Sequence, residues 1–144
     1  MANVIDVAKY ILDKTGEISA MKLQKLAYYS QAWALVWDDE EIFPEDFEAW
    51  ANGPVVKQLY SRHRGMFKVS AEQFSDGSPT NLKDYHRDTI DKVLDFYGDK
   101  TAQWLSNLTH NEEPWKIARD GITPMATCSE IITKASMAEY YVAL

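Results

Sequence analysis

The stretch from Met21 to Trp37 constrains the fold most, because the helix it predicts is apolar around most of its circumference beyond the first turn. A helix at a protein surface carries one apolar stripe, whereas a helix that is apolar all round is buried among other elements. Ser19 can cap its start by accepting a hydrogen bond from a backbone N–H of the first turn. We therefore expect the Leu23–Trp37 helix to be the most buried element of the fold.

Neither a membrane segment nor a secretory leader is predicted. The most apolar stretch, Leu26–Trp37, is interrupted by Ser30 and Gln31 and is too short to cross a bilayer. Residues Met1–Asp6 contain no basic stretch that leads into an apolar run. We therefore expect a soluble cytoplasmic protein with no membrane partner.

Helical patterns recur along the rest of the chain and predict a mainly α fold, a compact single domain of residues 1–144 with six or seven helices. A chain of 144 residues is long enough to bury one ordinary core. Asn3 can cap the first helix, Pro54 suits the first turn of the third, and Asp99 can cap the fifth. In the fifth helix, the residues expected to point inward are Thr101, Trp104, Leu105 and Leu108. Beside the central helix, we expect helices at residues 3–16, 54–65, 83–97, 99–110, 114–121 and from 127 onward.

Weaker signals mark the C-terminal part and two short segments. Thr127–Glu130 has the spacing of a capping box and would open the last helix, which then buries Ile131, Ala135, Ala138 and Val142. Phe47–Trp50 alternates in polarity and, together with Phe67–Val69, predicts at most a small β element of two or three strands. Residues 66–81 are weakly patterned, and we expect mobility there.

The charge of the chain argues against nucleic-acid partners. The formal net charge is −7 at pH 7, and a negative protein is repelled by a phosphate backbone. A local basic patch can override a net charge, so a DNA-binding regulator that uses Arg62, Arg64 and Lys68 remains an alternative function. No nucleic-acid partner is expected.

Carboxylates are concentrated in one acidic segment without any cation, formed by Asp38, Asp39, Glu40, Glu41, Glu45, Asp46 and Glu48. The stretch Lys57–Lys68 that follows carries cations and no carboxylate. Two interpretations stay open. The acidic segment docks a more basic partner protein, or the two stretches lie together and neutralise each other.

The residues that catalysis or metal binding would need lack partners in the sequence. His110 is the best candidate, because Glu112 and Glu113 follow it and a histidine beside carboxylates can hold a metal, so a small metal-dependent hydrolase centred on His110 is one alternative. A hydrogen-bonding histidine at a helix junction is the simpler interpretation, and His86 is expected on the exposed side of its helix. Cys128 is the only cysteine, which excludes an internal disulfide and a thiolate-rich zinc site. We expect no enzyme, no metal and no cofactor.

Four short strings carry a family resemblance. They are Lys22–Tyr29 with Gln31–Trp33, Phe47–Val56, Leu59–Tyr60 and Leu108–Arg119. The last string closely resembles the Thr-His-x-Glu-x-Pro-Trp segment of the Panacea domain, the antitoxin family that includes SocA-like and phage-associated GepA-like proteins. The resemblance covers about residues 23–119, and its pattern falls on Leu23, Lys25, Leu26, Tyr28, Trp50, Gly53, Pro54, Val55, Tyr60, His110, Glu112, Pro114 and Trp115.

The resemblance implies a compact helical antitoxin that neutralises a toxin encoded by an adjacent gene through direct protein contact. SocA-like members also deliver the toxin to a protease, so a proteolytic adaptor, with a protease as second partner, is the nearest alternative. The motif residues have structural explanations of their own: Gly53 and Pro54 set a turn and a helix start, and Trp50 and Trp115 have the size of core anchors. We therefore expect the acidic segment to contribute to the partner surface, with residues 66–81 or the terminal helices as the alternative location.

Overall fold

The computed structural model describes residues 2–144, within which seven α-helices, two short 3-10 helices and five short strands surround an apolar core. The mainly α fold is therefore as predicted. The elements are α1 (Val4–Thr15), β1 (Ile18–Ser19), α2 (Ala20–Trp37), β2 (Phe47–Trp50), β3 (Gly53–Val56), α3 (Lys57–His63), β4 (Lys68–Val69), η1 (Ala71–Phe74), η2 (Pro79–Asn81), α4 (Asp84–Tyr97), α5 (Ala102–His110), α6 (Glu113–Ala118), β5 (Ile131–Ile132) and α7 (Lys134–Val142).

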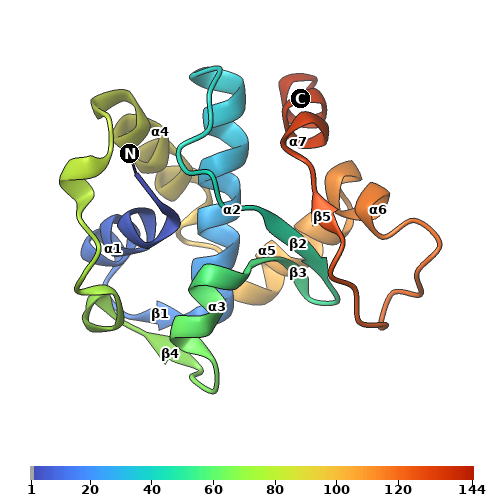
Figure 1. Ribbon diagram of the computed structural model, residues 1–144, viewed down its shortest axis with the longest axis horizontal. Helices are drawn as coiled ribbons and strands as arrows, with labels where there is room; N and C mark the ends of the chain where they lie inside the picture. The colour runs from blue at the N-terminus through green and yellow to red at the C-terminus, as the bar shows by residue number, and fades with distance from the viewer. Residues whose placement is uncertain (1) are drawn as a thin grey trace.

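Helix α2 runs through the middle of the molecule, with α1 and α4 on one side and α6, α7 and the β2–β3–β5 sheet on the other (Figure 1). Its residues are buried almost without interruption from Leu23 to Ala34, which confirms the expected central helix. Full burial of a leucine such as Leu23 or Leu26 stabilises the fold by about 1.5–3 kcal/mol. Trp37 is the exception to the predicted burial: it ends the helix and is 49% exposed.

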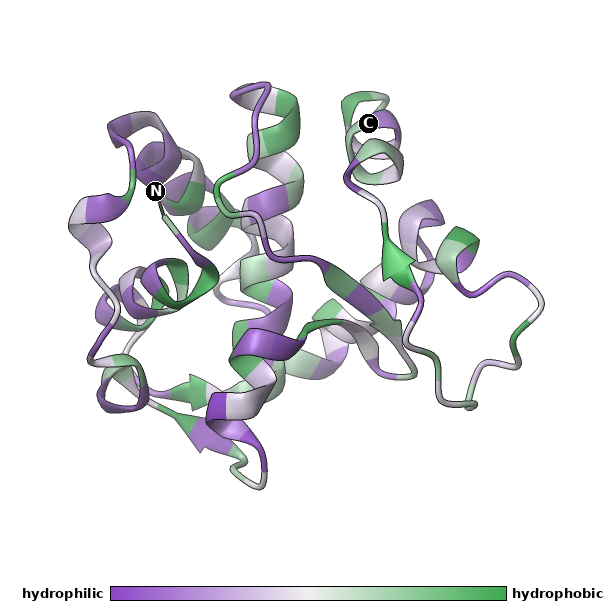
Figure 2. Cartoon of the chain, viewed as in Figure 1, coloured by the Kyte–Doolittle hydropathy of each residue, from purple (hydrophilic) through white to green (hydrophobic). Residues whose placement is uncertain are grey.

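Helices α1 and α4 are apolar on one face only, so green and purple alternate along both ribbons in Figure 2. The Asn3 side chain accepts a hydrogen bond from the Asp6 backbone N–H, and the Asp6 carboxylate accepts one from the Asn3 N–H, each at 3.0 Å. This reciprocal cap fixes the start of α1. The sequence pattern predicts the Asn3 cap but not the bond that Asp6 accepts in return. On α4, His86 is buried, so its predicted exposure is wrong.

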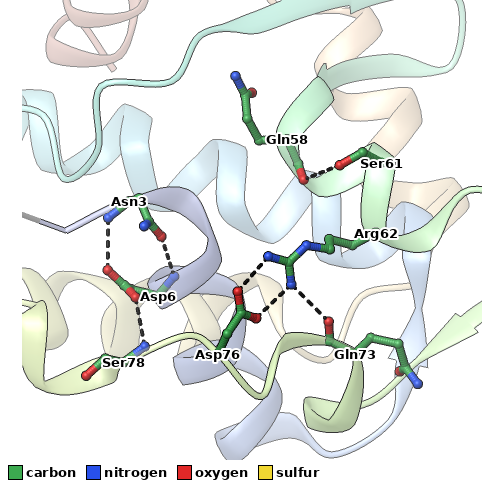
Figure 3. Close-up of polar contacts among 8 residues, drawn as sticks. All are labelled: Asn3, Asp6, Gln58, Ser61, Arg62, Gln73, Asp76 and Ser78. Atoms are coloured by element: carbon green, nitrogen blue, oxygen red, sulfur yellow. Dashed lines mark hydrogen bonds and ion pairs between the residues drawn. The ribbon is translucent and has the colours of Figure 1, made fainter.

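The weakly patterned residues 66–81 form β4, η1 and η2, and polar side chains tie them to the helices (Figure 3). The Arg62 guanidinium donates two hydrogen bonds to the Asp76 carboxylate, at 2.8 and 2.7 Å. The Asp6 carboxylate accepts a bond of 2.7 Å from the Ser78 backbone N–H. These partners lie far apart in sequence, so no local pattern indicated them, and the expected mobility stays a prediction.

Pro54 lies in strand β3 and not in the first turn of a helix, so the predicted start of α3 is corrected to Lys57. Strand β3 pairs antiparallel with β2, and Pro54 lies opposite Ala49. The Ala49 backbone N–H and carbonyl point away from Pro54, to the Glu130 carbonyl and to Arg119. The sheet order β3-β2-β5 also leaves β3 at the edge. A residue without an N–H is tolerated there because the ladder needs no donor from it.

The last helix begins at Lys134, capped by Thr133, and not at the predicted capping box of Thr127–Glu130. Ile131 and Ile132 form β5 instead, which pairs with β2. Val142 is exposed, and the buried face of α7 consists of Met137 and Tyr141, so the predicted face is wrong. The local sequence pattern predicted a helix at Ile131 and Ile132, but pairing with the distant strand β2 makes these residues a short strand.

Helix α5 differs from the prediction in its cap and in one buried residue. Its N-cap is Thr101, whose hydroxyl accepts a bond of 3.0 Å from the Trp104 backbone N–H, and not Asp99. Trp104 is exposed, so its predicted inward position is wrong, whereas Leu105 is buried as predicted.

Candidate functional site

A groove of about 890 Å³ opens between the N-terminal end of α2, the β2–β3 hairpin, α3 and the segments 65–67 and 125–129. Two family-motif residues, Trp50 of β2 and Tyr60 of α3, line it and pack edge to face with ring centroids 4.8 Å apart. The groove therefore brings together segments that are up to about 100 residues apart in the chain.

Four large apolar side chains beside the groove are exposed to solvent. Phe67 is 78% exposed and Met125 is 86% exposed, while Met21 and Met66 are exposed to a smaller extent. Methionine side chains are flexible and polarisable, and they adapt to the shape of a partner. An exposed apolar cluster beside a hollow is typical of a protein or ligand contact. From the sequence, residues 66–81, which include Met66 and Phe67, are only an alternative docking surface. No sequence pattern indicated Met21 or Met125 as contact residues.

Gln24 of α2 closes the free edge of strand β3. Its Oε1 accepts a hydrogen bond of 2.9 Å from the Val56 backbone N–H, and its Nε2 donates to the Val56 carbonyl at 3.2 Å. The same Nε2 lies 2.9 Å from Nε2 of His63, whose pKa is lowered by burial. The side-chain amide thus bonds β3 as a neighbouring strand would, so this part of the edge is not open to a partner strand.

Lys25 of α2 is buried in the groove wall beneath the hairpin. Its Nζ donates one hydrogen bond of 3.2 Å, to the Pro54 carbonyl. Burial lowers the pKa of Lys25 to about 7. Gly53 permits this arrangement, because a Cβ on Gly53 would lie 2.5 Å from Cε of Lys25. The motif residues Lys25, Gly53 and Pro54 therefore form one structural unit.

Glu112 ties α2, α6 and α7 together. Its Oε1 accepts hydrogen bonds from the hydroxyls of Tyr29 at 2.6 Å and Tyr141 at 2.7 Å. The Tyr141 hydroxyl also lies 3.2 Å from that of Tyr28. Burial raises the pKa of Glu112, and the two tyrosine hydrogen bonds oppose that shift. The motif carboxylate thus has a role in holding the helices together.

His110 and Glu112 have different partners, although they are close in sequence. The His110 ring packs against the Trp115 ring with centroids 4.3 Å apart, and burial lowers the pKa of His110. Trp115 in turn donates a bond of 2.8 Å to the Trp50 carbonyl. Within residues 2–144, no three His, Cys, Asp or Glu side chains lie close enough to hold a metal ion. His110 packs on Trp115, while Glu112 bonds Tyr29 and Tyr141.

Arg119 holds the wall of the groove that residues 125–129 form. Its guanidinium donates to the Ala49 carbonyl at 2.7 Å and to the carbonyls of Thr123 and Ala126 at 2.8 and 2.6 Å. The side chain is buried and packs on Trp115 at 5.0 Å. The sequence offered no local signal for this role, since its acceptors are backbone carbonyls set by the fold.

The acidic segment begins at the opposite end of α2 from the groove, where Asp38 is the C-cap. An α-helix of this length spans roughly 27 Å. Asp38 accepts a hydrogen bond of 2.6 Å from the Thr89 hydroxyl, and Glu40 forms an ion pair of 3.0 Å with Lys83. These two carboxylates therefore join the loop to α4.

The other carboxylates of the acidic segment have different partners. Lys134 of α7 lies 3.4 Å from Glu41 and 3.0 Å from Asp46, while Glu45 accepts a bond from the Val4 N–H. Lys57 lies 3.9 Å from Glu48, and this pair alone links the acidic and basic stretches within residues 2–144. The cations that neutralise the acidic segment are therefore mainly Lys83, at the start of α4, and Lys134 of α7. The interpretation in which the stretch Lys57–Lys68 neutralises the acidic segment is not supported.

The model of the family described as "Antitoxin SocA-like, Panacea domain" matches residues 23–116. The chain belongs to this family. The match begins in α2 and ends in α6, so the Panacea pattern covers most of the groove but not its wall at 125–129. Searches of curated proteins and of solved structures found no match. No helix within residues 2–144 combines the length and apolar character needed to cross a membrane.

The Panacea motif residues are mostly structural in this protein. Leu23, Leu26, Tyr28, Val55 and Pro114 are buried, as expected of residues that define a fold. Lys25, Trp50, Val55 and Tyr60 also line the groove, and the exposed Met66 and Phe67 lie beside them. Family membership therefore reports on the scaffold more than on the contact surface.

Proposed function

We propose that this protein is the antitoxin of a toxin–antitoxin pair and neutralises its toxin by direct binding. Membership of the SocA-like antitoxin family supports this function. The observation that carries it is the apolar rim of the groove, where Met21, Met66, Phe67 and Met125 are exposed beside a hollow of about 890 Å³. In this proposal the toxin is the product of an adjacent gene, both proteins act in the cytoplasm, and no catalytic step is involved.

The test is co-expression with the product of the neighbouring gene, with growth rescue and co-purification as readouts. We expect Phe67→Ser to lose both, because it removes an exposed apolar contact without disturbing the core. Ile117→Ser is the matched control, since Ile117 is 58% exposed on α6 and does not line the groove. A neighbouring product that neither slows growth nor co-purifies would contradict the proposal.

A proteolytic adaptor is the second candidate, because the molecule exposes another aromatic surface. Trp37 stacks on Trp33 with ring centroids 4.9 Å apart, and Lys92 lies 5.6 Å from the Trp37 ring. This surface is at the far end of α2 from the groove, and an adaptor needs separate surfaces for toxin and protease. The half-life of the toxin in cells distinguishes the two functions: an adaptor shortens it, and Trp37→Ala restores it while co-purification persists.

A further inference from the structure

Lys25 is a buried cation in the groove wall without a carboxylate beside it. Its side chain is 1% exposed, and its only hydrogen bond within residues 2–144 goes to the Pro54 carbonyl. A protonated lysine has three N–H donors, so two of them lack an acceptor. Removing one charge from water without a partner is costly, which is why burial lowers the pKa of Lys25 to about 7.

The groups around Lys25 do not supply the missing counter-charge. His63 of α3 and His110 of α5 are close enough for the Lys25 charge to lower the pKa of each further. Glu48 is the one carboxylate among the described residues that line the groove, and it accepts a bond of 3.0 Å from Nε1 of Trp50 while lying 3.9 Å from Lys57. Tyr60 and Cys128 are the other titratable residues of the lining. The groove therefore has an apolar rim and an unsatisfied donor in its wall.

We propose that the groove receives an apolar segment of the partner protein that carries a carboxylate, and that Lys25 binds this carboxylate. The inference rests on the proposed function, because it names the chemistry by which the antitoxin recognises its toxin. The apolar side chains of the segment cover Met66, Phe67 and Met125, while the carboxylate supplies the acceptor that Lys25 lacks. A partner segment with an amide in place of the carboxylate does not compensate the positive charge of Lys25, so it binds more weakly.

Binding of a carboxylate favours the protonated form of Lys25. The complex therefore takes up a proton when it forms at pH 8, and its affinity falls as the pH rises further. Since His63 and His110 already have lowered pKa values, neither adds a proton in this range.

The probes are hexanoate and its isostere hexanamide, added to the full chain at pH 8 while the Lys25 ¹³Cε resonance is followed by NMR. We expect hexanoate to bind about tenfold more tightly than hexanamide and to move the resonance toward its protonated position, because a hydrogen bond to a charged group is stronger than one between neutral groups. Lys116→Met is the matched control, since Lys116 is an exposed lysine on α6 that does not line the groove, and hexanoate should bind this variant as before. Equal binding of the two probes, or an unmoved Lys25 resonance, would overturn the assignment, and neither readout depends on whether Lys25→Met folds.

A second measurement separates this site from the proposed function. If the neighbouring gene product co-purifies, hexanoate should release it from the wild-type protein and hexanamide should not. Release by neither compound overturns the Lys25 contact while the antitoxin function stands. Binding of hexanoate at Lys25 without any co-purifying toxin leaves the carboxylate site in place and removes the toxin as its occupant, which overturns the proposal as stated.

Discussion

Gly53 lies directly against the side chain of Lys25: a Cβ at Gly53 would come within 2.5 Å of Lys25 Cε and 2.9 Å of Thr109 Oγ1. The φ angle of Gly53 is +114°, a conformation that side-chain-bearing residues rarely adopt. The turn of the β2–β3 hairpin and the burial of the lysine therefore depend on each other.

Replacing Gly53 by Ala should destabilise the fold by about 1–3 kcal/mol, because the backbone is strained and the lysine must move. Part of this cost should vanish in a Lys25→Ala background, where the closest steric conflict is gone. Urea unfolding of the two single variants and the double variant measures the coupling. Purely additive effects would show that Gly53 and Lys25 do not constrain each other.

Replacing Lys25 by Met should stabilise the protein near pH 7, by about 3–5 kcal/mol, because a buried amine with a lowered pKa is removed. The folded pKa of about 7 lies below the model value of 10.5, so the unfolded chain binds more protons between these two values. Wild-type stability should therefore rise with pH in this window relative to the variant. Unfolding measured at pH 6, 7, 8 and 9 gives the difference, with the exposed Lys116→Met as control. A difference that stays constant with pH would contradict the burial of a free amine.

Replacing Glu112 by Ala should cost about 2–4 kcal/mol, because the buried hydroxyls of Tyr29 and Tyr141 lose their acceptor. Glu112→Gln keeps an oxygen in the same place and should cost much less. The raised pKa means that wild-type stability falls as the pH rises from the unfolded value through the folded one, and the Gln variant should lack this slope. Thermal unfolding between pH 4 and 7 tests both points, and equal losses in the two variants would speak against the hydrogen-bonded role.

Replacing Arg119 by Lys should loosen residues 120–130 and lower the stability by about 2 kcal/mol, because an ammonium cannot reach all the carbonyls that the planar guanidinium bonds. Hydrogen–deuterium exchange should accelerate in this segment and stay unchanged in α1. Toxin binding should weaken as well, since residues 125–129 form a wall of the groove. Unaltered exchange in the segment would mean that other contacts hold it.

The acidic segment remains a predicted contribution to partner association. Asp39→Asn with Glu41→Gln removes two charges and spares Asp38 and Glu40, which bond Thr89 and Lys83. Asn tolerates the φ of 54° found at Asp39. We expect association with a basic toxin to slow about threefold at low salt, with little change in the dissociation rate.

The control for this pair removes the same number of charges from exposed positions outside the acidic segment, with Asp95→Asn and Glu139→Gln. Stopped-flow or biosensor kinetics at two salt concentrations compare the variants. An on-rate equal to that of the control pair would identify the segment as a solvated loop that serves only α4 and α7.

Elements whose signals are local could be predicted from the sequence alone. The central helix α2, the N-cap of α1 at Asn3, and the apolar faces of α1 and α4 all depend on residues within a few positions of one another. Periodicity and caps report such contacts directly. The family was likewise evident from short strings, because these strings encode the scaffold.

Residues whose partners are distant in the chain could not be predicted in this way, because their contacts form only in the assembled fold. Pro54 lies in a strand because the neighbouring strand β2 does not need a hydrogen bond from it. Ile131 lies in β5, opposite Glu48, and not in the last helix. Tyr29 and Glu112 are 83 positions apart, and Arg119 and Ala49 are 70 apart. The groove with Lys25 in its wall arises from the same long-range packing. Burial of a charge and the identity of its partners are properties of the assembled fold, so a local sequence pattern does not predict them.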